Sequence, residues 1–166
     1  ILEKMNRRHD REFYLETIKK IRAKKPDIAI GTDIIVGFCG ETEEKFQDTV
    51  TLFKECDFDI SYNAKYSERS GTVAAKAFTD DISKEEKKRR WFVLQDLMVD
   101  IAYKKNQVYV GKQVSVLVDT YKNNTCGGNS SEMKRVNFPG KKENLGTIVS
   151  VKINRAAEWI LWGDML

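Results

Sequence analysis

The chain has 166 residues, of which 41% are hydrophobic and 33% charged, with only 2 prolines. This is the composition of a soluble globular protein with one ordinary domain or two small ones. No apolar run approaches the length of a membrane span and no signal peptide is visible, and we expect no membrane partner.

Three cysteines, Cys39, Cys56 and Cys126, are an odd number at wide spacing. This spacing excludes a disulfide framework and a metal knuckle, and it favours a reducing, cytoplasmic location. The net charge of +4 is unevenly distributed, because residues 111–166 carry 8 Lys+Arg against 5 Asp+Glu, whereas residues 1–110 carry 21 against 20. A basic C-terminal part is compatible with a polyanion partner without establishing one.

The first half of the sequence alternates helix and strand signals. Asp10 can cap a helix to about residue 25, residues 28–38 form a dense β-branched run, and Thr42 can cap a second helix. Residues 58–67 make a second strand. This order predicts αβ units of a parallel sheet, with the first strand covered on both faces.

The pattern of the sequence changes after the next helix. Ser83 and Glu86 form a capping box that opens the longest predicted helix, to about residue 109. From Gly111, short alternating segments separated by turn residues predict a small antiparallel β-barrel. We therefore expect an α/β domain at residues 1–110 and an all-β, OB-like barrel at residues 111–166.

Two glycines, Gly37 and Gly40, follow the first predicted strand and precede a helix. Ligands of parallel α/β sheets lie at this end of the strands, and glycine lets a backbone approach an adenine or a phosphate closely. The alternative is a tight strand-to-helix turn without a ligand, and the spacing alone leaves both open.

Four stretches of the sequence resemble, in the same order, the radical-SAM methylthiotransferases, and the MiaB type that modifies tRNA most of all. They are "MNRRHDREFYLETIKKIR", "TDIIVGFCGETEEKF", "YSERSGTVAAK" and "MKRVNFPG". The resemblance covers essentially the whole chain. It implies that residues 1–110 are the later, C-terminal half of a radical-SAM (βα) barrel and that residues 111–166 are a TRAM domain, a small β-barrel that binds the RNA substrate.

The resemblance also implies a reaction and its cofactors. Such enzymes add a methylthio group to carbon 2 of isopentenyl-adenosine next to the tRNA anticodon, with S-adenosylmethionine and two 4Fe–4S clusters. The radical chemistry is that of the cofactors, and the protein orients them and the base. On this resemblance Asp33, Ile35 and Gly37 line the adenosyl group.

The sequence departs from the family pattern in three places. Cys39 and Ser70 stand where the family usually has proline. The cysteines that hold the two clusters are absent, and the three cysteines present are too far apart in sequence to replace them. No catalytic or metal-binding residue is therefore assigned in this chain, and we expect it to be inactive alone.

Cations and an aromatic ring in the second half suit phosphate contact and base stacking. The ordinary alternative is a set of surface lysines with a core phenylalanine. The RNA-binding residues predicted here are Lys112, Lys134, Arg135, Phe138, Lys152 and Arg155.

Other readings remain open. The chain can be an RNA-binding module without catalysis, or part of a methylthiotransferase that acts on threonylcarbamoyl-adenosine or on a ribosomal protein. Since the chain opens with Ile1 in what looks like the end of a helix, we expect a missing N-terminal half of the same protein. Without it, two parallel strands expose an apolar face, and we expect a dimer of the fragment to bury that face.

Overall fold

The computed structural model describes all 166 residues, which form two compact units, Ile1–Met98 and Val99–Leu166. The division falls within the longest helix, α4 (Lys84–Gln107), and the first strand of the β-barrel, β3, begins at Gln113. No helix combines the length and the apolar character that crossing a membrane requires.

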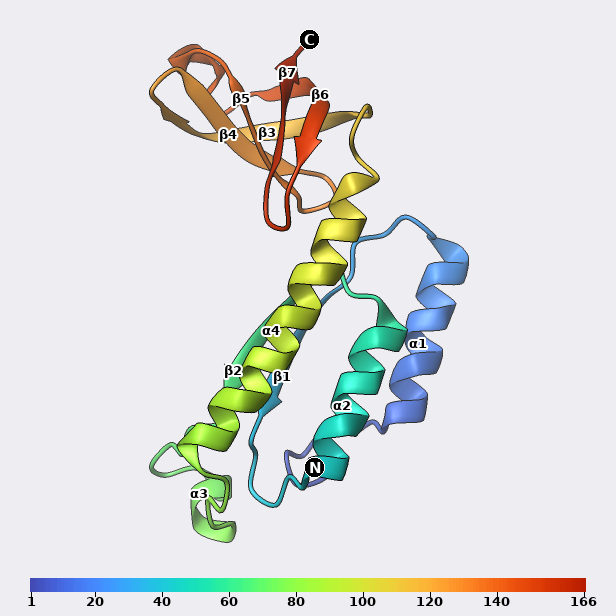
Figure 1. Cartoon of the computed structure of the whole chain (residues 1–166), viewed down its shortest axis with the longest axis vertical. Coiled ribbons are helices and arrows are strands. Elements are labelled where there is room, and N and C mark those ends of the chain that lie inside the picture. Colours follow the sequence, from blue (N-terminus) through green and yellow to red (C-terminus); the bar gives the residue numbers. More distant parts are fainter. The chain divides into compact units, whose positions relative to one another are not determined.

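The first unit contains α1 (Arg11–Lys24), β1 (Gly31–Val36), α2 (Glu43–Cys56), β2 (Ile60–Lys65), the short α3 (Val73–Ala77) and most of α4. β1 and β2 pair in parallel, with Gly31 opposite Ile60, as the helix–strand order predicted. Figure 1 shows α1 and α2 side by side in this unit. The fold class expected for the first half, part of a parallel α/β fold, is confirmed.

Local signals begin the helices where the sequence placed them. The Asp10 carboxylate accepts a hydrogen bond from the Phe13 backbone N–H, and the Thr42 hydroxyl accepts one from Lys45 N. The Ser83 hydroxyl accepts from Glu86 N at the start of α4. Each bond satisfies an N–H that has no partner within its helix.

The prediction that β1 is covered on both faces is wrong. Thr32, Ile34 and Val36 are at least half-buried, whereas Asp33 and Ile35 alternate with them and are exposed. Val36 belongs to a core that also contains Phe46, Phe53, Phe58, Leu94 and Met98. The run of β-branched residues could not reveal that only one face of the sheet is covered within this chain.

The second unit is a closed β-barrel. Its strands are β3 (Gln113–Lys122), β4 (Thr125–Ser130), β5 (Arg135–Pro139), β6 (Ile148–Ala156) and β7 (Leu161–Met165), in the spatial order β3-β4-β5-β7-β6, with the 3₁₀ turn η1 (Lys142–Asn144) before β6. Val116, Val118, Val136, Phe138 and Ile153 are among its buried core residues. The predicted small OB-like barrel is confirmed.

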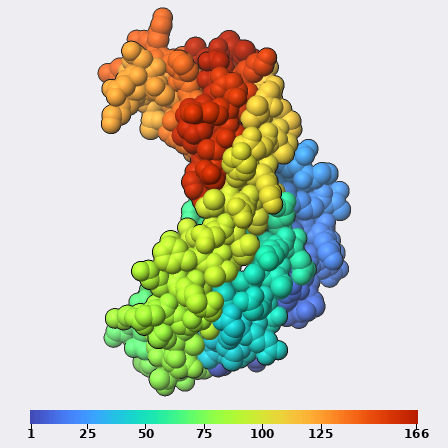
Figure 2. All heavy atoms as spheres, viewed as in Figure 1, coloured from blue at the N-terminus to red at the C-terminus, as the bar shows by residue number.

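One pair of barrel strands corrects the antiparallel prediction. β5 and β7 run parallel through Val136–Leu161 and Asn137–Trp162, because the chain crosses the barrel between them through η1 and β6. The end of α4 closes the barrel at the β6–β7 turn, where Asn106 Nδ2 donates to the carbonyls of Ala157 and Glu158 at 2.8 and 2.9 Å. Figure 2 shows these last turns of α4, in yellow, against the red C-terminal strands.

Candidate cofactor and RNA sites

The backbone geometry and packing of the turn after β1 account for its two glycines, and no ligand is needed to explain them. Gly37 and Gly40 both have positive φ, +73° and +76°, which L side chains rarely adopt. Gly37 is also buried, and a Cβ there would lie 2.3 Å from Cγ of Lys87. Lys87 is fixed by its ammonium group, which donates to both carboxylate oxygens of Asp80 at 2.6 Å. The Lys87 stem therefore occupies the space that a side chain at position 37 would need.

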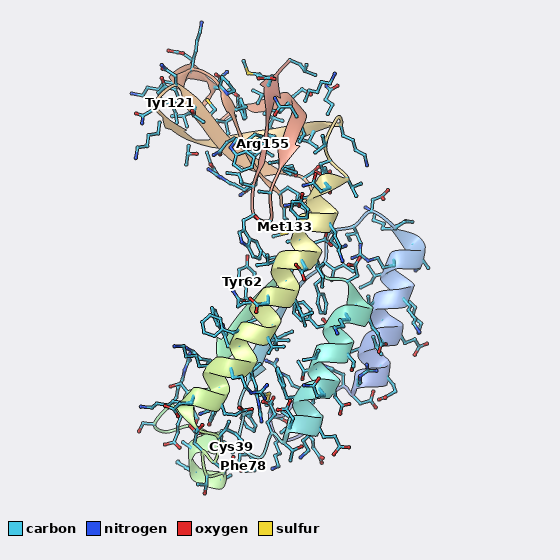
Figure 3. The ribbon with its side chains drawn as sticks, in the orientation of Figure 1. Cys39, Tyr62, Phe78, Tyr121, Met133 and Arg155 are labelled. Carbon is cyan, nitrogen blue, oxygen red and sulfur yellow. The ribbon has the colours of Figure 1, made fainter.

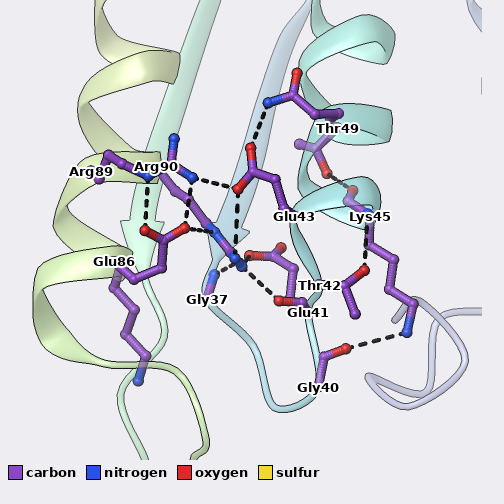
Figure 4. A network of polar contacts seen from close by, with 12 residues as sticks. Gly37, Gly40, Glu41, Thr42, Glu43, Lys45, Thr49, Glu86, Arg89 and Arg90 are labelled. Carbon is purple, nitrogen blue, oxygen red and sulfur yellow. Dashed lines mark hydrogen bonds and ion pairs between the residues drawn. The ribbon is translucent and has the colours of Figure 1, made fainter.

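A buried polar network holds this turn against α4 (Figure 4). Gly37 N donates to Glu41 Oε2 at 2.7 Å, and Arg90 Nη1 donates to the same oxygen at 2.6 Å. Glu41 and Arg90 are 3% and 4% exposed, so this is a buried ion pair whose polar atoms are hydrogen-bonded. The network orients the end of β1 rigidly.

Glu86 extends the network toward the surface. It accepts from Arg90 Nε at 2.7 Å and from Arg89 Nε at 2.8 Å. Hydrogen bonding from Arg89, assisted by Arg90, lowers the pKa of Glu86 to about 2. Its carboxylate is therefore ionised at neutral pH and balances two guanidinium groups.

Of the three predicted cofactor residues, two are accessible. Asp33 and Ile35 lie on the exposed face of β1, and Tyr62, which is 60% exposed, is the β2 partner of Asp33 (Figure 3). β1 from Gly31 to Ile35 borders a cavity of about 1310 Å³ that is also lined by parts of the N-terminal segment and of α2. Asp33 and Ile35 therefore line this cavity, whereas Gly37 does not.

The three cysteines do not fit an iron–sulfur cluster. Cys39, Cys56 and Cys126 are buried separately, after β1, at the end of α2 and in the barrel core. Burial raises the pKa of Cys56 to about 11 and also raises that of Cys126, which opposes the thiolate form that iron requires. No three potential metal ligands come together anywhere in the chain.

The predicted RNA-binding residues do not form one patch. Lys112 and Lys152 are exposed, whereas Lys134 is 7% exposed, with its ammonium group 6.0 Å from the Tyr109 ring centroid. Phe138 is 1% exposed in the barrel core, so its assignment as a stacking residue is corrected: the alternating pattern of β5 turns it inward.

The two arginines have defined partners on the outer barrel surface. Arg135 Nη1 donates to both oxygens of Asp119 at 2.7 Å. The guanidinium carbon of Arg155 lies 3.8 Å from the ring centroid of Trp162. Sequence reasoning did not assign Trp162 to the RNA surface, although its cross-strand position opposite Arg155 follows once the register is known.

Two family models match separate parts of the chain. Residues 1–53 match the family model of the radical SAM superfamily, and residues 107–166 match that of the TRAM domain. Over 99% of its length the chain is 44% identical to the tRNA-2-methylthio-N(6)-dimethylallyladenosine synthase of Clostridium botulinum strain Hall, covering 37% of that protein. It is 44% identical over its full length to the synthase of the same name from Bacillus subtilis, covering 33% of it.

The chain thus spans about a third of the length of the curated relatives it matches. A radical SAM region and a TRAM domain follow one another in it, and the similarity to these synthases runs through both. Along its whole length the chain is therefore similar to one part of the radical SAM methylthiotransferases of tRNA.

Proposed function

We propose that the chain is part of a cytoplasmic radical SAM enzyme that adds a methylthio group to carbon 2 of isopentenyl-adenosine, next to the anticodon of tRNA. The observation that carries the proposal is the 44% identity, unbroken from the radical SAM region through the TRAM domain, to synthases named for this product. The rest of such a protein, about two thirds of the relatives' length, is a necessary partner, because the buried, separated cysteines of this chain do not suit a cluster.

S-adenosylmethionine and two 4Fe–4S clusters would supply the radical chemistry of the whole protein. Within this chain, we propose that Asp33 and Ile35 line the adenosyl group from the exposed face of β1. Gly37 enters the proposal as the residue that turns the chain, and the Glu41–Arg90 pair as the contact that fixes this turn. Asp33 and Ile35 thus contact the cofactor, the other three residues hold the end of the strand that carries them, and none is assigned a step in the reaction.

The complete gene tests the proposal in a bacterial strain that lacks the modification. Mass spectrometry of tRNA nucleosides should find 2-methylthio-isopentenyl-adenosine. A methylthio group on threonylcarbamoyl-adenosine or on a ribosomal protein would show that the substrate is a different one. The absence of any methylthio product would refute the proposed enzymatic activity.

Cofactor binding can be tested separately from activity. In the whole protein, Asp33→Ala should weaken S-adenosylmethionine binding measured by equilibrium dialysis, whereas Asp27→Ala, in the exposed loop before β1, should not. Equal affinities in the two variants would remove Asp33 from the site.

A binding function without catalysis is the second candidate, and the closed barrel with its own core favours it for the chain alone. We propose that Lys112, Arg135, Lys152 and Arg155 contact RNA from the barrel, with Lys134 held closer to the core. The affinity of the chain for a tRNA anticodon stem-loop should fall steeply with salt, because phosphate contacts release counterions. An affinity insensitive to salt would contradict this role.

A second copy of the chain is the proposed cover for the exposed face of β1 and β2. Ile35 and Tyr62, 41% and 60% exposed, are apolar groups on that face. Sedimentation of the chain should show a dimer that Ile35→Lys with Tyr62→Lys dissociates and that Val73→Lys, on α3, leaves intact. A wild-type monomer at high concentration would rule out the dimer.

A further inference from the structure

One in-register row of residues crosses all the strands of the barrel. Backbone pairing places opposite one another, in order around the barrel, Thr120 of β3, Gly127 of β4, Asn137 of β5, Trp162 of β7 and Arg155 of β6. The next row contains Val136 and Leu161, both 0% exposed. Because successive side chains of a strand point to opposite faces, the first row faces outward. We name it the outer row.

The first half of the outer row is a fixed polar cluster above a glycine. A Cβ on Gly127 would lie 2.6 Å from Thr120 Oγ1, 2.7 Å from Arg135 Nη2 and 2.8 Å from Asn137 Oδ1. Arg135 Nη2 donates to Thr120 Oγ1 at 2.6 Å, and Asp119 holds its other terminal nitrogen. Gly127 therefore lets these side chains lie close to the strand, and the half-buried Asn137 amide stands at the edge of the cluster.

The second half of the outer row is a stacked pair. Arg155 is exposed and its guanidinium covers the half-buried Trp162 ring at 3.8 Å, as Figure 3 helps to locate. The other arginine of this surface faces a carboxylate, since Arg135 is paired with Asp119. Arg155 has the Trp162 indole as its partner instead, so its guanidinium is held over the ring.

Resting on the proposed RNA-binding role of the barrel, we propose that the outer row reads one unstacked adenine of a single-stranded RNA loop. The base lies on the outer face of the Arg155 guanidinium, since unpaired bases stack on arginine planes and aromatic rings. Asn137 is the backbone partner of Trp162, one strand or about 4.8 Å away, and its Oδ1 lies on the Gly127 side, so a base that extends from Arg155 across Trp162 meets the Asn137 amide with its edge. A side-chain amide matches the donor and acceptor pattern of adenine.

Anisotropy titrations of the 166-residue chain test this assignment. The probes are a fluorescein-labelled RNA hairpin with an adenine-rich loop, the same stem with a uracil loop, and a blunt duplex. Arg155→Lys keeps the charge and loses the plane, so it should weaken hairpin binding about tenfold without changing duplex binding or the salt dependence. Asn137→Ala should abolish the preference for the adenine loop.

Lys142→Ala is the matched control, since Lys142 is an exposed cation of η1 outside the outer row. It should weaken hairpin and duplex equally, as loss of a phosphate contact does. Indole emission gives a second readout: hairpin binding should quench it in wild type and in Trp159→Phe, and the quenching should disappear in Trp162→Phe. Thermal unfolding of each variant shows that the barrel is intact.

The outcomes separate the two proposals. A wild-type chain that binds neither hairpin nor duplex refutes RNA binding by the barrel, and the outer row with it. Wild-type binding that Arg155→Lys leaves unchanged, or that this variant weakens equally for hairpin and duplex, overturns the outer row alone.

Discussion

The two units of this protein satisfy their backbone hydrogen bonds in different ways. In the barrel every strand has a neighbour on both sides, and one apolar cluster fills the interior. In the α/β unit β1 and β2 pair only with each other, and the face with Ile35 and Tyr62 is exposed. A closed barrel has no edge to protect, whereas an open two-stranded sheet needs a cover that its own strands cannot supply.

The two units also differ in how deeply they bury their ion pairs. The α/β unit buries an ion pair, Glu41–Arg90, to fix the turn after β1. The barrel keeps its ion pair, Arg135–Asp119, on the outer surface, with side chains 32% and 43% exposed. A buried ion pair in one unit and a surface ion pair in the other predict different responses to substitution.

The largest effect should come from the barrel core. Phe138→Ala removes a ring that is 1% exposed and should lower the free energy of unfolding by about 3–5 kcal/mol. Met133→Ala, at a side chain that is 64% exposed, should change it by less than about 0.5 kcal/mol. Denaturant unfolding followed by circular dichroism measures both, and equal losses would show that the barrel does not depend on this core.

Breaking the buried ion pair should come next. Glu41→Ala leaves the buried Arg90 with Glu86 at 2.7 Å and the more distant Glu43 at 3.9 Å as carboxylate partners, and should lower the free energy of unfolding by about 3 kcal/mol. Glu44→Ala, on the exposed side of α2, is the control. Denaturant midpoints that coincide for the two variants would mean that the turn after β1 is not held by this pair.

A position can require glycine because its φ is positive or because a neighbouring group lies too close for a Cβ. Gly71 and Gly37 both have positive φ, so comparing them separates these two requirements. Gly71→Ala meets only the strain of φ +85°, since nothing lies within 4 Å of its Cβ, and should destabilise by about 1 kcal/mol. Gly37→Ala adds the contact with the Lys87 stem and should cost about 1–3 kcal/mol more. The comparison is made by thermal unfolding. If Gly37→Ala proved no worse than Gly71→Ala, the packing of Lys87 over Gly37 would not be the constraint.

Lowering the pH should modestly destabilise the α/β unit, because Glu86 becomes protonated. The pKa of Glu86 is lowered in the folded protein to about 2 from an ordinary value of 4.5. Its contribution to the free energy of unfolding is therefore complete above about pH 4.5 and is lost as the pH falls through about 2. The difference in thermal midpoint between wild type and Glu86→Gln should shrink over that range. Glu85→Gln, at an exposed neighbour, should show no such trend, and a constant gap for Glu86→Gln would contradict the shift.

Local chemistry made much of the fold predictable from the sequence. The caps at Asp10, Thr42 and Ser83, the parallel pairing of β1 and β2 and the small barrel all follow from residue type and spacing. Positive φ at Gly37 and Gly40 is likewise a property that glycine permits locally. Such features depend on neighbours a few residues away, which a sequence displays directly.

The tertiary structure alone decided what surrounds those residues. The packing of Lys87 over Gly37 and the pairing of Arg155 with Trp162 join residues that no local pattern connects. Whether a strand is covered on one face or two depends on which helices pack on it, and hydrophobicity along the strand does not record that. The sequence determined which elements form; packing and register decided which of their side chains can meet a ligand, because both are set by contacts between segments distant in the chain.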